Sequence, residues 1–177
     1  LKNGQKATIN GEEYDTFVGH HESHMAAGYY TAPFKDDVVC VVIDAIGEYD
    51  TASIWKDGEK VWSRTYPDSL GLFYSAITKR IGLKPNEDEY ITMGMAAYGE
   101  PSINMRWMFD LPDQNWHRGI PLAFFGGMAP EDIAASAQAE VERQITQVMN
   151  VAQNYGKNLC YGGGVALNCV ANSRILP

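Results

Sequence analysis

The run of residues 38–43, Val-Val-Cys-Val-Val-Ile, most constrains how this chain can fold. Five of its six residues are β-branched and none is charged, which is typical of a strand buried on both faces. Such a strand needs a covering layer on each side, so it predicts a sheet packed between helices. Further strands are predicted at 51–55 and 59–66, because Asp57-Gly58 is the strongest short-range hairpin signal in the chain. The sequence thus predicts three antiparallel strands in succession.

Helices are predicted from apolar spacing, capping residues and breakers. The longest begins at Pro130, a favoured first helical residue, and its apolar stripe runs to Tyr155 before Gly156. Another is capped by Ser69 and ends before Gly82. Shorter helical patterns cover residues 20–31, 85–98 and 165–176. We expect a strand at 159–161, a surface loop or hairpin at 1–16, and an irregular segment at 101–129.

Composition and charge restrict the class of protein. The 177 residues are 45% hydrophobic and 20% charged, which is ordinary for a globular chain with its own core. The net charge of -8 disfavours a nucleic-acid backbone as partner, although local N–H groups can still bind a nucleotide. No apolar run approaches the ~20 residues of a membrane span, and the three cysteines are typical of reduced core thiols. We therefore expect a cytoplasmic protein, of which this chain, starting without Met, is a part.

Three of the four histidines fall within residues 20–24. If this segment is helical, His20 and His24 lie one turn apart on one face and can form half of a metal site. Histidines at this spacing also occur on ordinary helix surfaces, so the spacing leaves both interpretations open. A catalytic metal needs at least one more protein ligand. The zinc-peptidase pattern H-E-x-x-H is absent, because His21 and His24 are only three residues apart.

The loop after the buried strand carries a second group of candidates. Asp44 ends the strand, where a carboxylate can coordinate a metal, contact a phosphate through a metal, or cap the turn. Gly47 lets the backbone approach a phosphate closely, because it has no Cβ. Glu48 and Asp50 on the same loop are weaker candidates.

A run of three glycines lies between the last predicted strand and the last predicted helix. The N–H groups and the positive dipole end of such a helix suit a phosphate or a ribose. A tight turn would use the same glycines, so the pattern alone is weak. The candidate nucleotide-binding residues are Gly47, Gly162, Gly163, Gly164, Val165 and Asn168.

Three antiparallel strands, a helix and a strand–glycine–helix unit follow the order of a ribonuclease-H-like lobe, which is duplicated in the actin, hexokinase and sugar-kinase ATPases. This analogy predicts an α/β (α+β) fold with a mixed sheet flanked by helices. We assign residues 1–34 to the end of a first lobe with the histidine helix, and residues 35–177 to most of a second lobe. The metal would then lie in the cleft between the two lobes.

Five motifs extend this analogy to a family. In order they are Gly19-His20-His21-x-x-His24-x-Ala26-Ala27-x-x-Tyr30, Asp44-x-x-Gly47-Glu48-x-x-Thr51, Ser69-Leu70-Gly71-x-x-Tyr74-Ser75, Glu89-Tyr90-x-x-Met93-Gly94-x-Ala96-x-Tyr98-Gly99 and Gly163-Gly164-Val165-Ala166-Leu167-Asn168-Cys169-Val170-Ala171-Asn172. From about residue 17 onward, the chain resembles the O-carbamoyltransferases of the nodulation-factor, cephalosporin and tobramycin type.

The resemblance implies a Kae-like domain of the actin-like ATPase superfamily. It implies that ATP and carbamoyl phosphate form carbamoyladenylate in a second domain, expected beyond Pro177, and that the carbamoyl group passes to a hydroxyl of a small-molecule acceptor. A divalent metal is implied at His20 and His24 with a later aspartate, and iron, zinc or manganese suits such ligands. We expect the third ligand beyond Pro177. Asp44 matches the family's loop aspartate near carbamoyl phosphate, and Asp44 or His21 would accept the hydroxyl proton.

Two other functions share part of the pattern. A tRNA threonylcarbamoyl-transfer protein also has H-x-x-x-H and a Gly-Gly-Val-Ala-x-Asn loop, but the second and fourth motifs and the acidic balance fit an O-carbamoyltransferase better. A non-catalytic nucleotide-binding module would bind a nucleotide without a metal.

The chain also departs from the family pattern at three places. It has Ile91-Thr92 where many members carry a lysine, Met95-Ala96-Ala97 where they carry Leu-Ala-Pro, and a 101–129 segment that is shorter than in many members.

Overall fold

The computed structural model describes residues 6–14, 17–112 and 114–175. Its main sheet consists of β3 (Val38–Gly47), β4 (Asp50–Lys56), β5 (Glu59–Thr65) and β6 (Asn158–Gly162), in the order β5-β4-β3-β6. The first three strands pair antiparallel, and β6 joins β3 in parallel. The predicted antiparallel strands and mixed sheet are confirmed, whereas the ribonuclease-H-like assignment stays a prediction.

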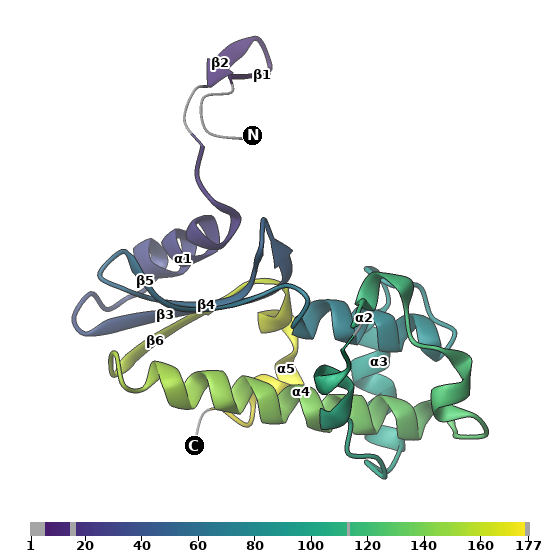
Figure 1. Ribbon diagram of the computed structural model, residues 1–177. Helices are drawn as coiled ribbons and strands as arrows, with labels where there is room; N and C mark the ends of the chain where they lie inside the picture. Colours follow the sequence, from purple (N-terminus) through teal and green to yellow (C-terminus); the bar gives the residue numbers. More distant parts are fainter. Residues whose placement is uncertain (1–5, 15–16, 113, 176–177) are drawn as a thin grey trace.

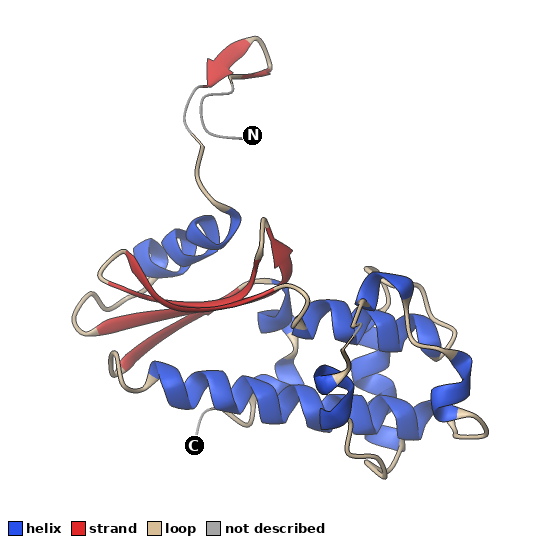
Figure 2. Ribbon diagram, viewed as in Figure 1, coloured by secondary structure: helices blue, strands red, loops and turns tan. Residues whose placement is uncertain are grey.

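The sheet lies between α1 (His20–Thr31) on one face and α4 (Pro130–Ala152) on the other (Figures 1 and 2). Alternate side chains of β3 point to opposite faces, as in any strand. Val39, Val41 and Ile43 join the large core with α4, whereas Val38 and Cys40 join a small core beneath α1. This two-sided burial is the physical reason for the unbroken apolar run.

The large core also includes the helices between β5 and α4. The α2 helix (Leu70–Arg80) begins after Ser69, whose Oγ accepts a hydrogen bond from the Leu72 N–H, and α3 (Glu89–Met95) continues into η1 (Ala96–Tyr98). The described residues of the irregular segment form three 3₁₀ helices, η2 (Arg106–Asp110), η3 (Trp116–Arg118) and η4 (Leu122–Phe125). Trp116 packs edge-on and Phe109 packs at a tilt against Phe73 of α2, and these contacts anchor the segment to the core.

The predicted continuous helix over 165–176 is wrong. The chain forms η5 (Gly164–Leu167), breaks at Asn168, and then forms α5 (Cys169–Asn172). Asn168 has non-helical dihedral angles, φ -75° and ψ 87°, and its side-chain oxygen accepts a hydrogen bond from the Ala171 N–H. An asparagine that hydrogen-bonds nearby backbone in this way starts a helix instead of continuing one. Residues 176–177 lie outside the described residues.

The N-terminal segment forms the hairpin that was one of its two predicted states. β1 (Ala7–Ile9) pairs with β2 (Glu12–Tyr14) across the Asn10-Gly11 turn, where both residues have positive φ. Residues 1–5 and 15–16 of this prediction lie outside the described residues. Among the described residues, no helix is both long and apolar enough to cross a membrane.

The α1 helix packs on β3 and β6 (Figure 1). The histidine helix therefore lies directly on the sheet that we assigned to the second lobe. The division of the chain at residues 34 and 35 stays a prediction.

Candidate metal and nucleotide site

A carboxylate oxygen of Asp44 lies between the two predicted metal ligands. The Nε2–H of His20 donates to Asp44 Oδ2 at 2.8 Å, and His24 Nε2 lies 3.1 Å from the same oxygen. One ligand atom from each residue lies within 4.8 Å of the other two. Two ligand atoms on one metal with bonds of about 2.0–2.2 Å lie at most about 4.4 Å apart, and both histidine–Asp44 separations are within that limit. The three side chains are therefore candidate ligands of a single metal ion.

Two elements bring these ligands together. The α1 helix is confirmed, and the four-residue spacing places the rings of His20 and His24 with their centroids 4.8 Å apart. Asp44 comes from β3, at the point where its pairing with β4 shifts register between Ile43 and Gly47. Such an irregularity redirects side chains that would otherwise alternate regularly. The third ligand, expected beyond Pro177, has a candidate in Asp44 within the chain.

The charge state of Asp44 suits a metal ligand. Burial favours the neutral carboxyl, but hydrogen bonds from His20 and from the Ala45 N–H outweigh burial and lower the pKa of Asp44. The residue is therefore ionised at neutral pH. A lowered pKa also makes Asp44 a weak general base, because an efficient base has a pKa near the working pH.

Close backbone contacts fix the loop that carries Asp44. A Cβ on Gly71 of α2 would lie 2.6 Å from the Ala45 backbone, and Ser69 Oγ donates to the Ala45 carbonyl at 2.5 Å. A Cβ on Gly47 would lie 2.6 Å from the ring of His21 and 2.7 Å from that of His20. The loop is thus held by α2 on one side and α1 on the other. The predicted role of Gly47, close approach to a phosphate, stays a prediction; the structure shows close approach to two histidine rings.

The glycine turn after β6 lies beside the ligands. A Cβ on Gly162 would lie 3.5 Å from the His24 carbonyl oxygen, and a Cβ on Gly164 3.0 Å from Asp44 Oδ1. Gly163 has φ +92°, and a Cβ there would overlap the Ile43 carbonyl. Gly163 and Gly164 therefore allow the turn to lie close to β3, next to the candidate metal site.

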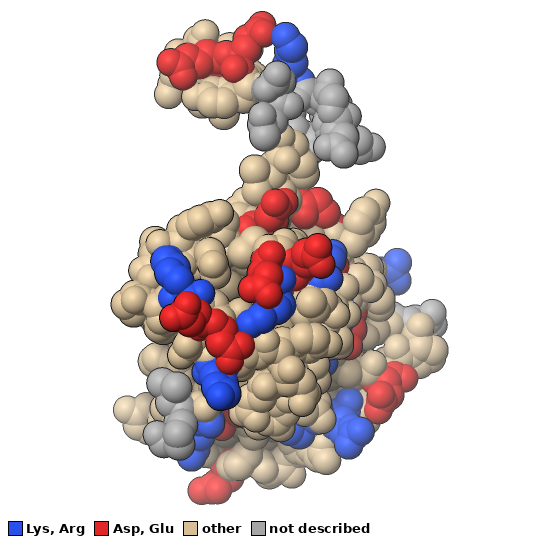
Figure 3. All heavy atoms as spheres, turned by 90° about the vertical axis from the view of Figure 1, so that its left-hand side faces the viewer, with Lys and Arg blue, Asp and Glu red and all other residues tan. Residues whose placement is uncertain are grey.

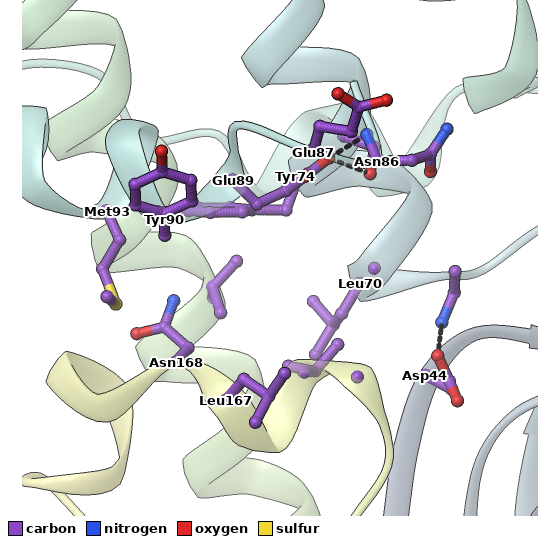
Figure 4. A pocket seen from close by; sticks show the side chains of 16 residues that line it. Asp44, Leu70, Tyr74, Asn86, Glu87, Glu89, Tyr90, Met93, Leu167 and Asn168 are labelled. Atoms are coloured by element: carbon purple, nitrogen blue, oxygen red, sulfur yellow. Dashed lines mark hydrogen bonds between the residues drawn. The ribbon is translucent and has the colours of Figure 1, made fainter. Parts of the chain in front are cut away.

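A pocket of about 420 Å³ extends from Asp44. Figure 4 shows Asp44 at one end and Tyr90 and Met93 of α3 at the other, with Leu167 along one side. The other lining residues come from β3, α2, the loop before α3, α3 itself, α4 and the segment from the glycine turn to Asn168: Ala45, Leu70, Gly71, Tyr74, Ser75, Asn86, Glu87, Glu89, Val141, Gly164, Val165 and Asn168. A largely apolar cavity that ends at polar groups is the usual form of a small-molecule site.

Asn168 lines this pocket, but its amide is already engaged. Its Nδ2 donates to Gln138 Oε1, and its Oδ1 accepts from Gln138 Nε2 and from the Ala171 N–H. Tyr74 also donates to Gln138 Oε1. Asn168 therefore holds the glycine turn against α4, and a direct ligand contact would have to break this pairing.

His21 does not lie where a base or a substrate contact is needed. Its side chain points under α1, is only 2% exposed, and has Nδ1 2.7 Å from Ser53 Oγ. The Trp55 indole N–H donates to the same hydroxyl, and burial lowers the pKa of His21. The expectation that His21 accepts a proton from the substrate stays a prediction, and the burial of the ring against the sheet argues against it.

Charged side chains are interspersed on the described part of the face in Figure 3. A nucleic-acid backbone requires a continuous basic stripe or patch, and this mixed distribution does not resemble one. The expectation against a nucleic-acid partner stays a prediction.

Several residues of the site were not predicted from the sequence. Glu89, Tyr90 and Met93 belong to the fourth motif, which was a signal that could have identified this wall of the pocket. Ser53 and Gln138 lie outside all five motifs, and their contacts with His21 and Asn168 join residues at least 30 positions apart. Nothing local in the sequence signals such contacts.

Comparison with known proteins places this chain in a family. The profile described as carbamoyltransferase N-terminus matches residues 6–120 and 120–177. The chain is 36% identical over 195 residues to the uncharacterised protein sll1178 of Synechocystis, covering 90% of the chain and 32% of that protein. It is 28% identical over 208 residues to nodulation protein NolNO of Sinorhizobium fredii, covering 99% and 30%. It is 27% identical over 191 residues to nodulation protein NolO of Bradyrhizobium diazoefficiens, covering 90% and 33%.

The chain spans about a third of the length of these relatives. The profile covers almost all of the chain, from the hairpin through β6 to the last residue. The predicted resemblance is confirmed at this level: the chain belongs to the carbamoyltransferase N-terminus family, whose name indicates a transferase.

Proposed function

We propose that this chain is the part of an O-carbamoyltransferase that moves a carbamoyl group from carbamoyladenylate to a hydroxyl of a small-molecule acceptor. One observation carries the proposal. Asp44 contacts both His20 and His24, and the same carboxylate forms one end of the 420 Å³ pocket. This contact supports a candidate metal site that is continuous with a cavity of the size of a small-molecule site.

The three side chains would hold a divalent metal, which as a Lewis acid would polarise a carbonyl or phosphoryl oxygen. Two imidazole nitrogens and one carboxylate oxygen suit iron, zinc or manganese.

The remaining residues would bind and orient the donor. The wall of Leu70, Tyr90, Met93 and Leu167 offers apolar surface to a planar base. The glycine turn brings backbone close to Asp44, where a phosphate would lie. With the donor fixed in this way, the acceptor hydroxyl would attack the carbamoyl carbon, and the bond from that carbon to the phosphate oxygen of AMP would break. AMP would leave, and the hydroxyl proton would pass to the departing phosphate or to water. Asp44 was a candidate base, but its lowered pKa and its two histidine contacts support a ligand role.

The proposal is tested by calorimetric titration of the protein with Zn²⁺ or Mn²⁺ and, separately, with ATP. Wild-type protein should bind both, and His20→Ala, His24→Ala and Asp44→Asn should each lose metal binding. The remaining histidine gives a matched control, because His117 lies in η3, outside the ligand group, so His117→Ala should bind metal normally. Release of AMP from supplied carbamoyladenylate in the presence of a small alcohol should be lost in the variants that lose metal binding and kept in His117→Ala.

The alternatives give different results. Binding of ATP with no metal binding, and no AMP release, would identify a non-catalytic nucleotide-binding module. Transfer that requires tRNA and ignores small alcohols would favour the tRNA-modifying function.

A further inference from the structure

The first turn of the histidine helix is capped from a distant loop. Its N-cap residue is Gly19, which has no side chain to accept a hydrogen bond from the free N–H groups of the first turn. The carboxylate of Glu48 takes this role, because its two oxygens lie 3.2 and 3.3 Å from the backbone nitrogen of His20. A negative charge at this end of α1 also interacts favourably with the helix dipole.

Glu48 occupies a backbone conformation that its own residue type disfavours. It is the first residue of the two-residue turn between β3 and β4, and it has φ +48°. Glycine and asparagine are the residues that such turn positions favour. A glutamate that persists in a left-handed turn position suggests a role for its side chain beyond forming the turn.

The same short loop positions the metal-binding group at three points. Asp44 supplies the carboxylate between the histidines, Gly47 packs against the His20 ring, and Glu48 binds the His20 backbone. We propose that Glu48 is a positioning residue that sets His20 against Asp44 by capping the first turn of α1. This inference rests on the proposed function, because it requires His20 and Asp44 to bind a metal. Glu48 contributes to metal binding without touching the metal.

The test compares four variants in the protein. Glu48→Ala removes the cap, and Glu48→Gln keeps an acceptor oxygen. Glu48→Gly removes the cap but supplies the residue that the turn prefers, so it separates capping from turn stability. Glu22→Ala is the matched control, because Glu22 carries the same charge in the first turn of α1 and its carboxylate also lies near Gly19.

Two measurements report the result. Hydrogen exchange of the His20 amide, followed by NMR, reports the cap directly, and titration with Co²⁺ reports the metal affinity and the ligand-field spectrum. Glu48→Ala and Glu48→Gly should both accelerate exchange at His20 and weaken Co²⁺ binding by about 10-fold, the usual effect of losing a residue that orients a ligand. Glu48→Gln should recover most of the affinity, and Glu22→Ala should behave like the wild type.

Wild-type Co²⁺ affinity and spectrum in Glu48→Ala would overturn the inference. Equal losses in Glu22→Ala and Glu48→Ala would also overturn it, because they would show an effect of total charge. Failure of the proposed function has a different signature: wild-type protein and His20→Ala would both leave Co²⁺ unbound, which would overturn the metal site and this role of Glu48 together.

Discussion

Replacing Gly71 by alanine tests whether the backbone contact between α2 and the Asp44 loop positions the site. In an ordinary helix this substitution stabilises by up to about 1 kcal/mol, because glycine loses more conformational entropy on folding. Here the new Cβ would lie 2.6 Å from both Cα and N of Ala45 and 3.0 Å from the carbonyl carbon of Asp44. Carbon atoms pack at about 3.5–4.0 Å, so the overlap is about 1 Å against backbone that cannot rotate away.

Overpacking of this kind costs about 1–3 kcal/mol. After subtraction of the helix-propensity gain, we expect Gly71→Ala to lower the free energy of unfolding by up to about 2 kcal/mol. For a chain of this size, that loss lowers the melting temperature by up to roughly 8 °C. The displaced loop should also weaken metal binding, because Asp44 precedes the strained residue.

A matched substitution supplies the control. Gly94 lies in α3, and a Cβ there would meet no atom within 4 Å, so Gly94→Ala should raise the melting temperature. Thermal unfolding of both variants, followed by circular dichroism, compares one chemical change in two environments. A rise in melting temperature for both variants, with metal affinity unchanged in Gly71→Ala, would refute the claim that this contact is tight and positions Asp44.

Three further predictions concern the interior. Asn168→Ala should cost about 1–3 kcal/mol in urea unfolding, because the buried Gln138 amide loses two hydrogen bonds and the Ala171 N–H loses its acceptor; wild-type stability would show that the pair is not formed. His21→Ala should also lower stability by about 1–3 kcal/mol, since it leaves the buried Ser53 hydroxyl without this partner; full stability with transfer abolished would restore His21 as the base. Ellman's reagent should modify exposed Cys169 rapidly but not Cys40, because burial raises the pKa of the Cys40 thiol to about 12. Because the pKa of Cys40 is raised from 9.0 to about 12, the neutral thiol contributes to the free energy of unfolding below pH 9.0, and this contribution is lost as the pH rises toward 12. Rapid modification of Cys40 at pH 8 would contradict its burial.

The helices and strands that are determined by residues close together in the chain could be predicted from the sequence. The strand at 38–43 follows from β-branched residues that need burial on both faces, and the long helix follows from Pro130 and its apolar stripe. The histidine pair follows from helical geometry alone, because residues four apart always share a face. In each case, the residues that determine the feature are neighbours in the chain.

Other features were decided by contacts between distant residues. Periodicity predicted a helix through Asn168, but its amide pairs with Gln138 and caps α5, so the helix breaks there. His21 is one of three neighbouring histidines in the sequence, and only the packing of α1 on β4 buries it while leaving its neighbours at the site.

The candidate site itself combines both kinds of information. The sequence determined which residue types could bind a metal, and the family motifs named Asp44. Only the tertiary structure placed the Asp44 carboxylate within 3.1 Å of both histidine nitrogens and put Glu48 on the His20 amide 28 positions away. The physical reason is that ligand geometry depends on how a helix packs against a strand end, and no local pattern in the sequence encodes that packing.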